Sequence, residues 1–204
     1  MLEIIEIGRR HRKRQALHAK LLTAADHLFR ERGMGGTTVD DIAEAADVAR
    51  QTVFNHFPYK EAFALELGAA SVHRAAQRAQ AMLESAVPAL EVLEAAGQWI
   101  VDDAIVDREV AMVVAQELLH TDTERAARAA KHVPLEKLFE AILEQAREEG
   151  DIREDLPLDV VSSRLSCIIT SLVAQATSCE PTVLRRNVCI CYDMLFNGLV
   201  KRSA

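Results

Sequence analysis

The sequence is poor in aromatic residues, glycine and proline. Aromatic side chains make up 4% of its 204 residues, and it contains 8 Gly and 5 Pro. Sheets favour aromatic and β-branched residues joined by many tight turns, so this composition favours helices. No apolar run reaches the roughly 18 residues that a membrane-spanning helix needs, so we expect no membrane partner.

The sequence also has no pattern typical of secretion or metal binding. In MLEIIEIGRR at the N-terminus, basic residues follow a short apolar stretch, the reverse of a secretory signal, so we expect a cytoplasmic protein. The four cysteines show no zinc-site spacing with a second Cys or His pair. We expect buried free thiols, no metal and no cofactor. The cysteines are Cys167, Cys179, Cys189 and Cys191.

The charge is unevenly distributed. The net charge of −7 argues by itself against nucleic-acid binding. However, residues 1–60 carry ten Lys or Arg against eight Asp or Glu, whereas residues 61–204 carry fourteen against twenty-three. Five of the early basic residues lie in RRHRKR, at residues 9–14. This segment is either a DNA-binding arm or an uninvolved solvated tail, and charge alone does not decide between them.

The next segment has the pattern of a long helix followed by a short one. Residues 15–32 place apolar side chains at helical spacing, and Gly33 is a typical helix stop. Thr38, followed three residues later by Asp41, resembles a capping box with Asp in place of the usual Glu. We expect it to begin a short helix that ends at Asp47.

A second short helix is predicted from about residue 49 to 56, within ARQTVFNHFPYK. Val53 forms its inward face, and Pro58 ends it. Two short helices after a long one, joined by a tight turn, indicate a helix-turn-helix. The outward face of the second helix then carries hydrogen-bonding side chains suited to a DNA major groove. These are Arg50, Gln51, Thr52, Asn55 and His56.

The rest of the chain shows helical patterns and no strand pattern. Short connections between the segments are typical of a compact bundle, so the predicted fold is all-α. The predicted helices cover residues 61–85, 89–106, 108–120, 124–149, 158–178 and 182–202.

The stretch TTVDDIAEAADVARQTVFNHFPYKEAF resembles the helix-turn-helix of TetR-family (tetracycline-repressor-like) transcriptional regulators. The resemblance covers roughly residues 15–65. It implies a three-helix DNA-binding domain at 15–61 and a helical-bundle ligand-binding and dimerisation domain at 62–204, and the basic segment before them gives a third region, an N-terminal arm at 1–14. The matching residues are Thr38, Ile42, Ala43, Ala46, Val48, Thr52, Val53, His56, Phe57, Lys60 and Glu61.

Three positions depart from the family pattern. Asp47 stands where Gly is usual, in a turn that can require a left-handed residue. Ala49 replaces a Ser that would cap the recognition helix. Phe54 replaces a Tyr and so lacks a hydroxyl for a phosphate.

The resemblance assigns roles to the polar residues of the head. It implies that Thr38, Thr52, His56 and Lys60 contact phosphates, which suits hydroxyl, imidazole and ammonium groups near helix N-termini. Arg50, Gln51 and Asn55 are candidate base readers, because Arg suits guanine and Gln or Asn suits adenine. We assign Phe57 to the core and Phe54 to the boundary between protein and DNA.

The resemblance also implies a ligand pocket in the body and a dimer interface. The predicted interface uses the helices near 158–178 and 182–202. Asp103 and Trp99, one helical turn apart, are the most suggestive pocket pair. For each pocket candidate the alternative is an ordinary core or surface position. The candidates are Trp99, Asp103, Met112, Gln116, His120, Phe139, Ile142 and Thr170.

The predicted function is a homodimeric repressor that binds a near-palindromic double-stranded DNA operator and is released by a small-molecule effector. The alternatives are an activator, a ligand-independent DNA-binding regulator, or a small-molecule-binding module whose DNA head has decayed. An enzyme is disfavoured. The adjacent carboxylates Asp102–Asp103 and Glu148–Glu149 point apart on a helix, and no His pair stands four residues apart with a Glu.

Overall fold

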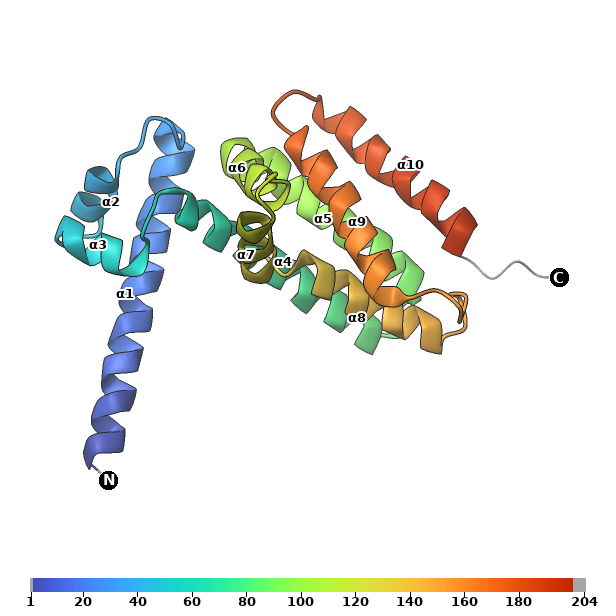
Figure 1. Cartoon of the computed structure of the whole chain (residues 1–204), viewed down its shortest axis with the longest axis horizontal. Coiled ribbons are helices and arrows are strands. Elements are labelled where there is room, and N and C mark those ends of the chain that lie inside the picture. The colour runs from blue at the N-terminus through green and yellow to red at the C-terminus, as the bar shows by residue number, and fades with distance from the viewer. Residues whose placement is uncertain (1, 200–204) are drawn as a thin grey trace. The chain divides into compact units, whose positions relative to one another are not determined.

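The structure is a computed structural model that describes the backbone of residues 2–199 and the side chains of residues 11–196. The chain divides into two compact units, Met1–Leu67 and Gly68–Ala204, called here the head and the body. Within residues 2–199 there are ten helices and no strand, which confirms the predicted all-α fold (Figure 1). No helix in that span is long and apolar enough to cross a bilayer.

The head consists of three helices and the start of a fourth. They are α1 (Leu2–Arg32), α2 (Val39–Ala45), α3 (Arg50–His56) and α4 (Glu61–Glu84). Helix α1 begins well before residue 15, where the sequence pattern placed its start. No proline interrupts this stretch, so the basic segment continues the helix. The side chains of residues 11–14 are exposed, and those of Arg9 and Arg10 lie outside the described part.

Aromatic rings from three elements form the centre of the head. Phe57, just after α3, stacks on Phe63 of α4 with ring centroids 3.8 Å apart. Phe29 of α1 meets Phe63 edge-on at 6.4 Å. Val53 and Ile42 are also fully buried. This packing confirms Phe57 as a core residue and fixes α3 with its opposite face outward.

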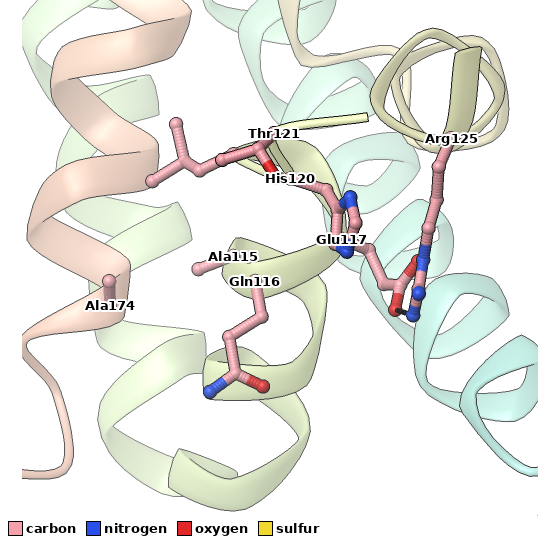
Figure 2. Close-up of a pocket in the computed structure, with 8 residues that line it drawn as sticks. Ala115, Gln116, Glu117, His120, Thr121, Arg125 and Ala174 are labelled. Atoms are coloured by element: carbon pink, nitrogen blue, oxygen red, sulfur yellow. Dashed lines mark hydrogen bonds and ion pairs between the residues drawn. The ribbon is translucent and has the colours of Figure 1, made fainter. Parts of the chain in front are cut away.

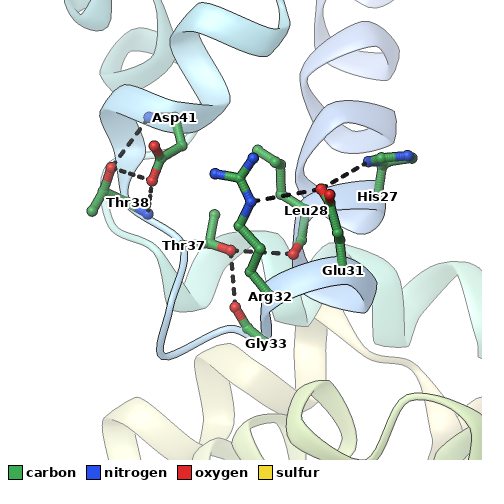
Figure 3. A network of polar contacts seen from close by, with 8 residues as sticks. All are labelled: His27, Leu28, Glu31, Arg32, Gly33, Thr37, Thr38 and Asp41. Atoms are coloured by element: carbon green, nitrogen blue, oxygen red, sulfur yellow. Dashed lines mark hydrogen bonds and ion pairs between the residues drawn. The ribbon is translucent and has the colours of Figure 1, made fainter.

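The turns of the head follow the local chemistry of the sequence. Gly33 ends α1 with a φ of 74°. Thr38 and Asp41 form the predicted capping box at the start of α2 (Figure 3). Asp47 has a φ of 50°, so the turn before α3 does require a left-handed residue. Ala49 caps α3 without a side-chain hydrogen bond, as expected from the missing hydroxyl.

The body contains the rest of α4 and six further helices, with α5, α8 and α9 packed together and α10 beside α9 and α5 (Figure 1). Large apolar residues fill its core, among them the fully buried Phe139 and Ile142 of α8. The helices are α5 (Ala89–Val106), α6 (Arg108–Leu118), α7 (Thr123–His132), α8 (Leu135–Glu148), α9 (Leu158–Ala174) and α10 (Pro181–Leu199).

Three boundaries in the body correct the sequence-based prediction. The single helix predicted at 124–149 is divided at Pro134, because proline disfavours helical geometry in the residue before it. Helix α6 ends at Leu118, so His120 lies in the following loop and does not end a helix. Helix α9 ends at Ala174. Residues 200–202 of the predicted last helix lie outside the described part.

The cysteines are free, as expected, but the prediction that they are buried is wrong. Cys167 and Cys189 are exposed, and Cys179 and Cys191 are half-buried. The thiol of Cys189 accepts a hydrogen bond from Gln98 Nε2 at 3.2 Å. The sequence pattern could not show that α9 and α10 turn Cys167, Cys189 and Cys191 away from the core, or that Cys179 lies in the loop between these helices.

Candidate nucleic-acid interface and ligand groove

Helix α3 presents one buried and one polar face. Val53 is fully buried, and the other six residues of the helix are exposed or half-buried. Arg50, Gln51 and Asn55 are exposed, and Thr52, Phe54 and His56 are half-buried. All six of these predicted DNA-contact residues therefore lie on one short helix and are at least partly accessible, with Gln51 and Asn55 on the side away from Val53.

Arg50 is held between two neighbours. Its Nη1 lies 2.8 Å from Oδ2 of Asp40, in the first turn of α2. Its guanidinium carbon lies 5.4 Å from the ring centre of Phe54, one turn further along α3. Both contacts leave other N–H groups of the guanidinium available, because Arg has five donors.

The two amide side chains of α3 are neighbours along the helix. Gln51 Nε2 donates a hydrogen bond to Asn55 Oδ1 at 3.3 Å, the four-residue spacing at which helical side chains meet. A base edge that accepts from one amide and donates to the other could replace this weak bond at small cost.

His56 lies beside α1 at the end of α3. Its ring centre is 5.8 Å from that of His18, whose own ring stacks on Phe57 at 4.5 Å. His18 Nε2 is in turn 3.2 Å from Oε1 of Glu66. Partial burial lowers the pKa of His56, with His18 and Arg14 as further causes. The lowered pKa favours the neutral ring, which still offers one N–H donor.

Thr38 combines a capping role with an exposed position. Its Oγ1 accepts from the Asp41 backbone N–H at 3.2 Å and donates to Asp41 Oδ2 at 2.6 Å. The hydrogen bond from the Thr38 hydroxyl is the main reason why the pKa of Asp41 is lowered. A phosphate contact by Thr38 would compete with this cap, because a phosphate oxygen only accepts hydrogen bonds and the single hydroxyl proton is donated to Asp41.

Lys60 has an unexpected set of partners. Its ammonium donates to the backbone carbonyls of Met34 at 2.7 Å and Thr37 at 3.2 Å. The Thr37 hydroxyl donates to the Gly33 carbonyl at 2.9 Å in the same loop (Figure 3). Lys60 therefore closes the loop between α1 and α2, and one ammonium proton remains for a phosphate. The sequence signal was a lysine at a helix start, where the helix dipole disfavours a cation.

The body has an open groove of about 550 Å³. Figure 2 shows that the end of α6, the loop after it and the end of α9 surround it. Two predicted pocket residues, Gln116 and His120, line it. His120 Nδ1 accepts from the backbone N–H of Asp122 at 3.0 Å, which fixes the ring. The full lining is Ala115, Gln116, Glu117, Leu119, His120, Thr121, Arg125 and Ala174.

An ion pair that the sequence reading missed bounds this groove. Glu117 is only 6% exposed, and Arg125 of α7 donates to both of its carboxylate oxygens (Figure 2). The hydrogen bonds from Arg125 hold the pKa of Glu117 below its usual range. The eight-residue separation crosses a loop, so helical spacing gave no signal for this pair.

The structure places the other predicted pocket residues elsewhere in the body. Trp99 lies under Arg78 of α4, with the guanidinium carbon 5.6 Å from the ring centre. Asp103 Oδ2 accepts from both Ser71 and Arg74 of α4 at 2.6 Å. Its neighbour Asp102 accepts from Arg185 of α10 at 2.7 Å. The two adjacent carboxylates thus point apart, as expected.

The remaining pocket candidates are split between the core and its edge. Phe139 and Ile142 are fully buried, and Met112 is half-buried. The Thr170 hydroxyl donates to the Ser166 carbonyl one turn earlier in α9 at 2.7 Å. These four do not line the groove that contains Gln116 and His120.

Two sequence profiles cover most of the chain. The profile of bacterial regulatory proteins of the tetR family matches residues 21–67. The profile of the C-terminal domain of TetR/AcrR family transcriptional repressors matches residues 69–198.

Individual relatives agree with these profiles. The transcriptional repressor KstR2 of Mycobacterium tuberculosis is 29% identical over 149 residues, which is 70% of this chain and 72% of KstR2. The Thermus thermophilus repressor FadR, solved with lauroyl-CoA, matches with a TM-score of 0.82 and 29% identity over 92% of this chain and 97% of its own. FadR of Bacillus halodurans shares the fold with a TM-score of 0.64, at 21% identity over 91% of this chain and 97% of its own. This chain belongs to the TetR family of transcriptional repressors.

Proposed function

We propose that this protein is a homodimeric repressor that binds a near-palindromic operator and leaves it when an acyl-CoA thioester binds the body. The likeness to the Thermus thermophilus repressor carries the effector class, since that relative was solved with lauroyl-CoA and matches 92% of this chain at 29% identity. The exposed face of α3 supports the DNA-binding part.

DNA recognition is assigned to α3 in the major groove. Arg50, Gln51 and Asn55 read base edges, and Thr38, Thr52, His56 and Lys60 hold phosphates, with Phe54 at the edge of the contact. A twofold dimer presents two such helices roughly 34 Å apart, one turn of DNA. This symmetry is the reason for a near-palindromic operator.

Dimerisation is assigned to α9 and α10. Val183, Ile190 and Met194 share one side of α10, and Met194 is 70% exposed. Val160 adds an exposed apolar side chain on α9. Burying such a surface against its own copy is favourable, so Ile190→Glu combined with Met194→Glu should yield monomers in light scattering. A double variant that remains dimeric would place the interface elsewhere.

The groove is the proposed effector contact. Its volume is within the roughly 300–1,000 Å³ usual for small-molecule sites, and its opening lets a longer ligand extend outward. Alanine and leucine side chains suit an acyl chain, and Gln116 and His120 supply polar partners. For release to occur, the effector must bind the DNA-incompetent state more tightly than the operator-bound state.

A steroid-like effector is the second candidate. The solved structure of the ketosteroid regulator KstR2 matches 91% of this chain with a TM-score of 0.53. At 22% identity this match supports the fold, and it carries less weight for the effector than the match at 29%.

The test is operator release followed by fluorescence anisotropy. Labelled DNA from upstream of the protein's own gene is bound, then lauroyl-CoA, CoA or lauric acid is added below micellar concentration. We expect lauroyl-CoA alone to release the DNA. Release by none of them would contradict an acyl-CoA effector and leave a steroid-like effector or a ligand-independent regulator. Transcription measured with and without the protein would separate repression from activation.

Filling the groove tests where the effector acts. Ala174→Phe should abolish the response to lauroyl-CoA while DNA binding persists. Ala130→Phe adds the same bulk at an exposed position of α7 outside the groove lining and should respond normally. A normal response in both variants would exclude the groove as the effector contact.

A further inference from the structure

We infer that Asp40 is a specificity-determining residue, which positions Arg50 for a base edge and lowers the affinity for DNA that lacks the matching base. This inference rests on the proposed operator binding by α3. The carrying observation is that Nη1 of Arg50 donates a hydrogen bond to a carboxylate oxygen of the neighbouring helix at 2.8 Å, a contact that favours one direction of the side chain before DNA binds.

Two neighbouring side chains determine the position of the Arg50 guanidinium. Asp40, in the first turn of α2, occupies one N–H of Nη1. Phe54 lies beside the guanidinium on α3, one turn after Arg50. The remaining N–H groups keep their planar fork, which is the arrangement that pairs with two acceptors of guanine.

Fixing a long side chain in advance favours the matched base. A free arginine loses considerable rotamer freedom when it binds, whereas a held one has already lost part of it. An arginine held in one direction is also less able to swing toward a phosphate when the base is wrong. Asp40 therefore favours base contacts over general backbone contacts of Arg50.

The charge of Asp40 acts in the same direction. A carboxylate next to a recognition helix repels the phosphates of any DNA and partly cancels the charge of Arg50. This penalty applies to every sequence. Only a base that pairs with the held guanidinium compensates for it, so the ratio of specific to non-specific affinity rises.

The pair contributes little to folding, which makes the inference testable. The side chains of Arg50 and Asp40 are 60% and 61% exposed, and ion pairs this exposed add little stability. Asp40→Asn also keeps the size of the side chain and leaves the Thr38 cap in place, so it removes only the modest favourable interaction of one charge with the helix dipole. We therefore expect the variant to fold normally, as checked by its melting curve.

The experiment selects a randomised double-stranded DNA library with the full-length protein and sequences the bound fraction. The variants are Asp40→Asn, Asp40→Glu, Arg50→Gln and the Asp40→Asn/Arg50→Gln pair. Glu44→Gln is the matched control, because it removes the same charge from an exposed position of α2, whereas the ion pair of Arg50 is with Asp40. Non-specific affinity is measured separately on random DNA at two salt concentrations.

Arg50→Gln should lose roughly 10- to 100-fold discrimination at one base pair of each half-site. Asp40→Asn should lose about three- to tenfold at the same base pair, and bind random DNA about two- to threefold more tightly at low salt. Asp40→Glu should restore part of the discrimination. In the Arg50→Gln background, Asp40→Asn should change only the non-specific affinity. In the native background, Glu44→Gln should likewise change only the non-specific affinity.

An unchanged base preference in Asp40→Asn, with enrichment by the native protein intact, would overturn the inference and leave the proposed function standing. An equal loss of discrimination from Asp40→Asn with and without Arg50 would also overturn it, because Asp40 would then act through another residue. If the native protein enriches no sequence at all, the proposed operator binding fails first, and the inference fails with it.

Discussion

The helix cap and the amide pair on the predicted DNA-binding face of the head, and the bonds that join helices in the body, connect polar side chains over different distances along the chain. In the head, Thr38 bonds to Asp41 three residues away, and Gln51 bonds to Asn55 four residues away. In the body, Asp102 bonds to a partner 83 residues away, and Asp103 to one 29 residues away. Short-range bonds shape a binding surface that sequence motifs encode, whereas long-range bonds join helices whose pairing no local motif encodes.

The largest expected effects on stability come from substitutions in the cores of the two units. Phe57→Ala removes a ring that stacks at 3.8 Å on Phe63 and should cost about 3–5 kcal/mol. Phe139→Ala is the matched variant of the body, because it removes an equally buried ring there. We expect the first variant to lose DNA binding and retain lauroyl-CoA binding, measured by calorimetry. Loss of both activities in Phe57→Ala would contradict separate stability of the two units.

A smaller effect should follow from the ion pair of the body. Arg125→Gln leaves the Glu117 carboxylate without its main partner and should cost about 1–2 kcal/mol at pH 7, since Arg125 is itself partly exposed. Arg128→Gln is the control. Its pair with Glu124 is 4.0 Å long and exposed, so it should change stability by less than about 0.5 kcal/mol.

The same pair gives a pH dependence with a defined sign. The pKa of Glu117 is lower in the folded protein than its ordinary value of about 4.3. The pair therefore stabilises the fold above that ordinary value, and this contribution is lost as the pH falls through the lower, folded value. Urea unfolding at pH 7 and pH 4 should show that the difference in free energy of unfolding between the native protein and Arg125→Gln is smaller at pH 4. A larger difference at pH 4 than at pH 7 would contradict this pH dependence.

Capping the recognition helix should have an effect of about 1 kcal/mol. Ala49 offers α3 no side-chain cap, and Ala49→Ser supplies one. Urea unfolding should show the gain in free energy of unfolding. The double variant Ala49→Ser/Phe54→Tyr should change DNA affinity little if the head is adapted to its operator. A large gain in DNA affinity would instead favour the decayed-head alternative.

The smallest effects are expected at two residues with a strained backbone, one in each unit. Ala86 and Asp47 have φ values of 58° and 50°, and Gly adopts this conformation without strain. Ala86→Gly should stabilise by about 1 kcal/mol, and Asp47→Gly by about 0.5 kcal/mol, because Asp tolerates the left-handed region better than Ala. Melting temperatures in the opposite order would show that contacts of Asp47 or Ala86 outweigh backbone strain.

The head could be predicted largely from its sequence because its structure depends on near neighbours. The bounds of α2 and α3, the capping box at Thr38, the left-handed turn at Asp47 and the uncapped start at Ala49 all follow from residues within one or two turns. The two carbonyls bound by Lys60 could not be predicted, since they come from a loop more than twenty residues earlier.

The body shows why the rest could not be predicted. Its helices follow from their apolar spacing, but Pro134 divides one of them where continuous periodicity suggested a single element. The pocket candidates were chosen by residue type, and residue type does not separate a core Phe139 from a groove-lining Gln116. The pair of Glu117 and Arg125 depends on how the loop between α6 and α7 folds back.

The most direct test of the central claim is binding of the full-length protein to DNA from upstream of its own gene, compared with random DNA of the same length, at two salt concentrations. The account predicts specific affinity at least roughly 10³-fold above non-specific affinity at physiological salt, and weaker binding to both DNAs as salt rises. Equal, weak binding to both, together with no sequence enriched from a random library, would contradict it.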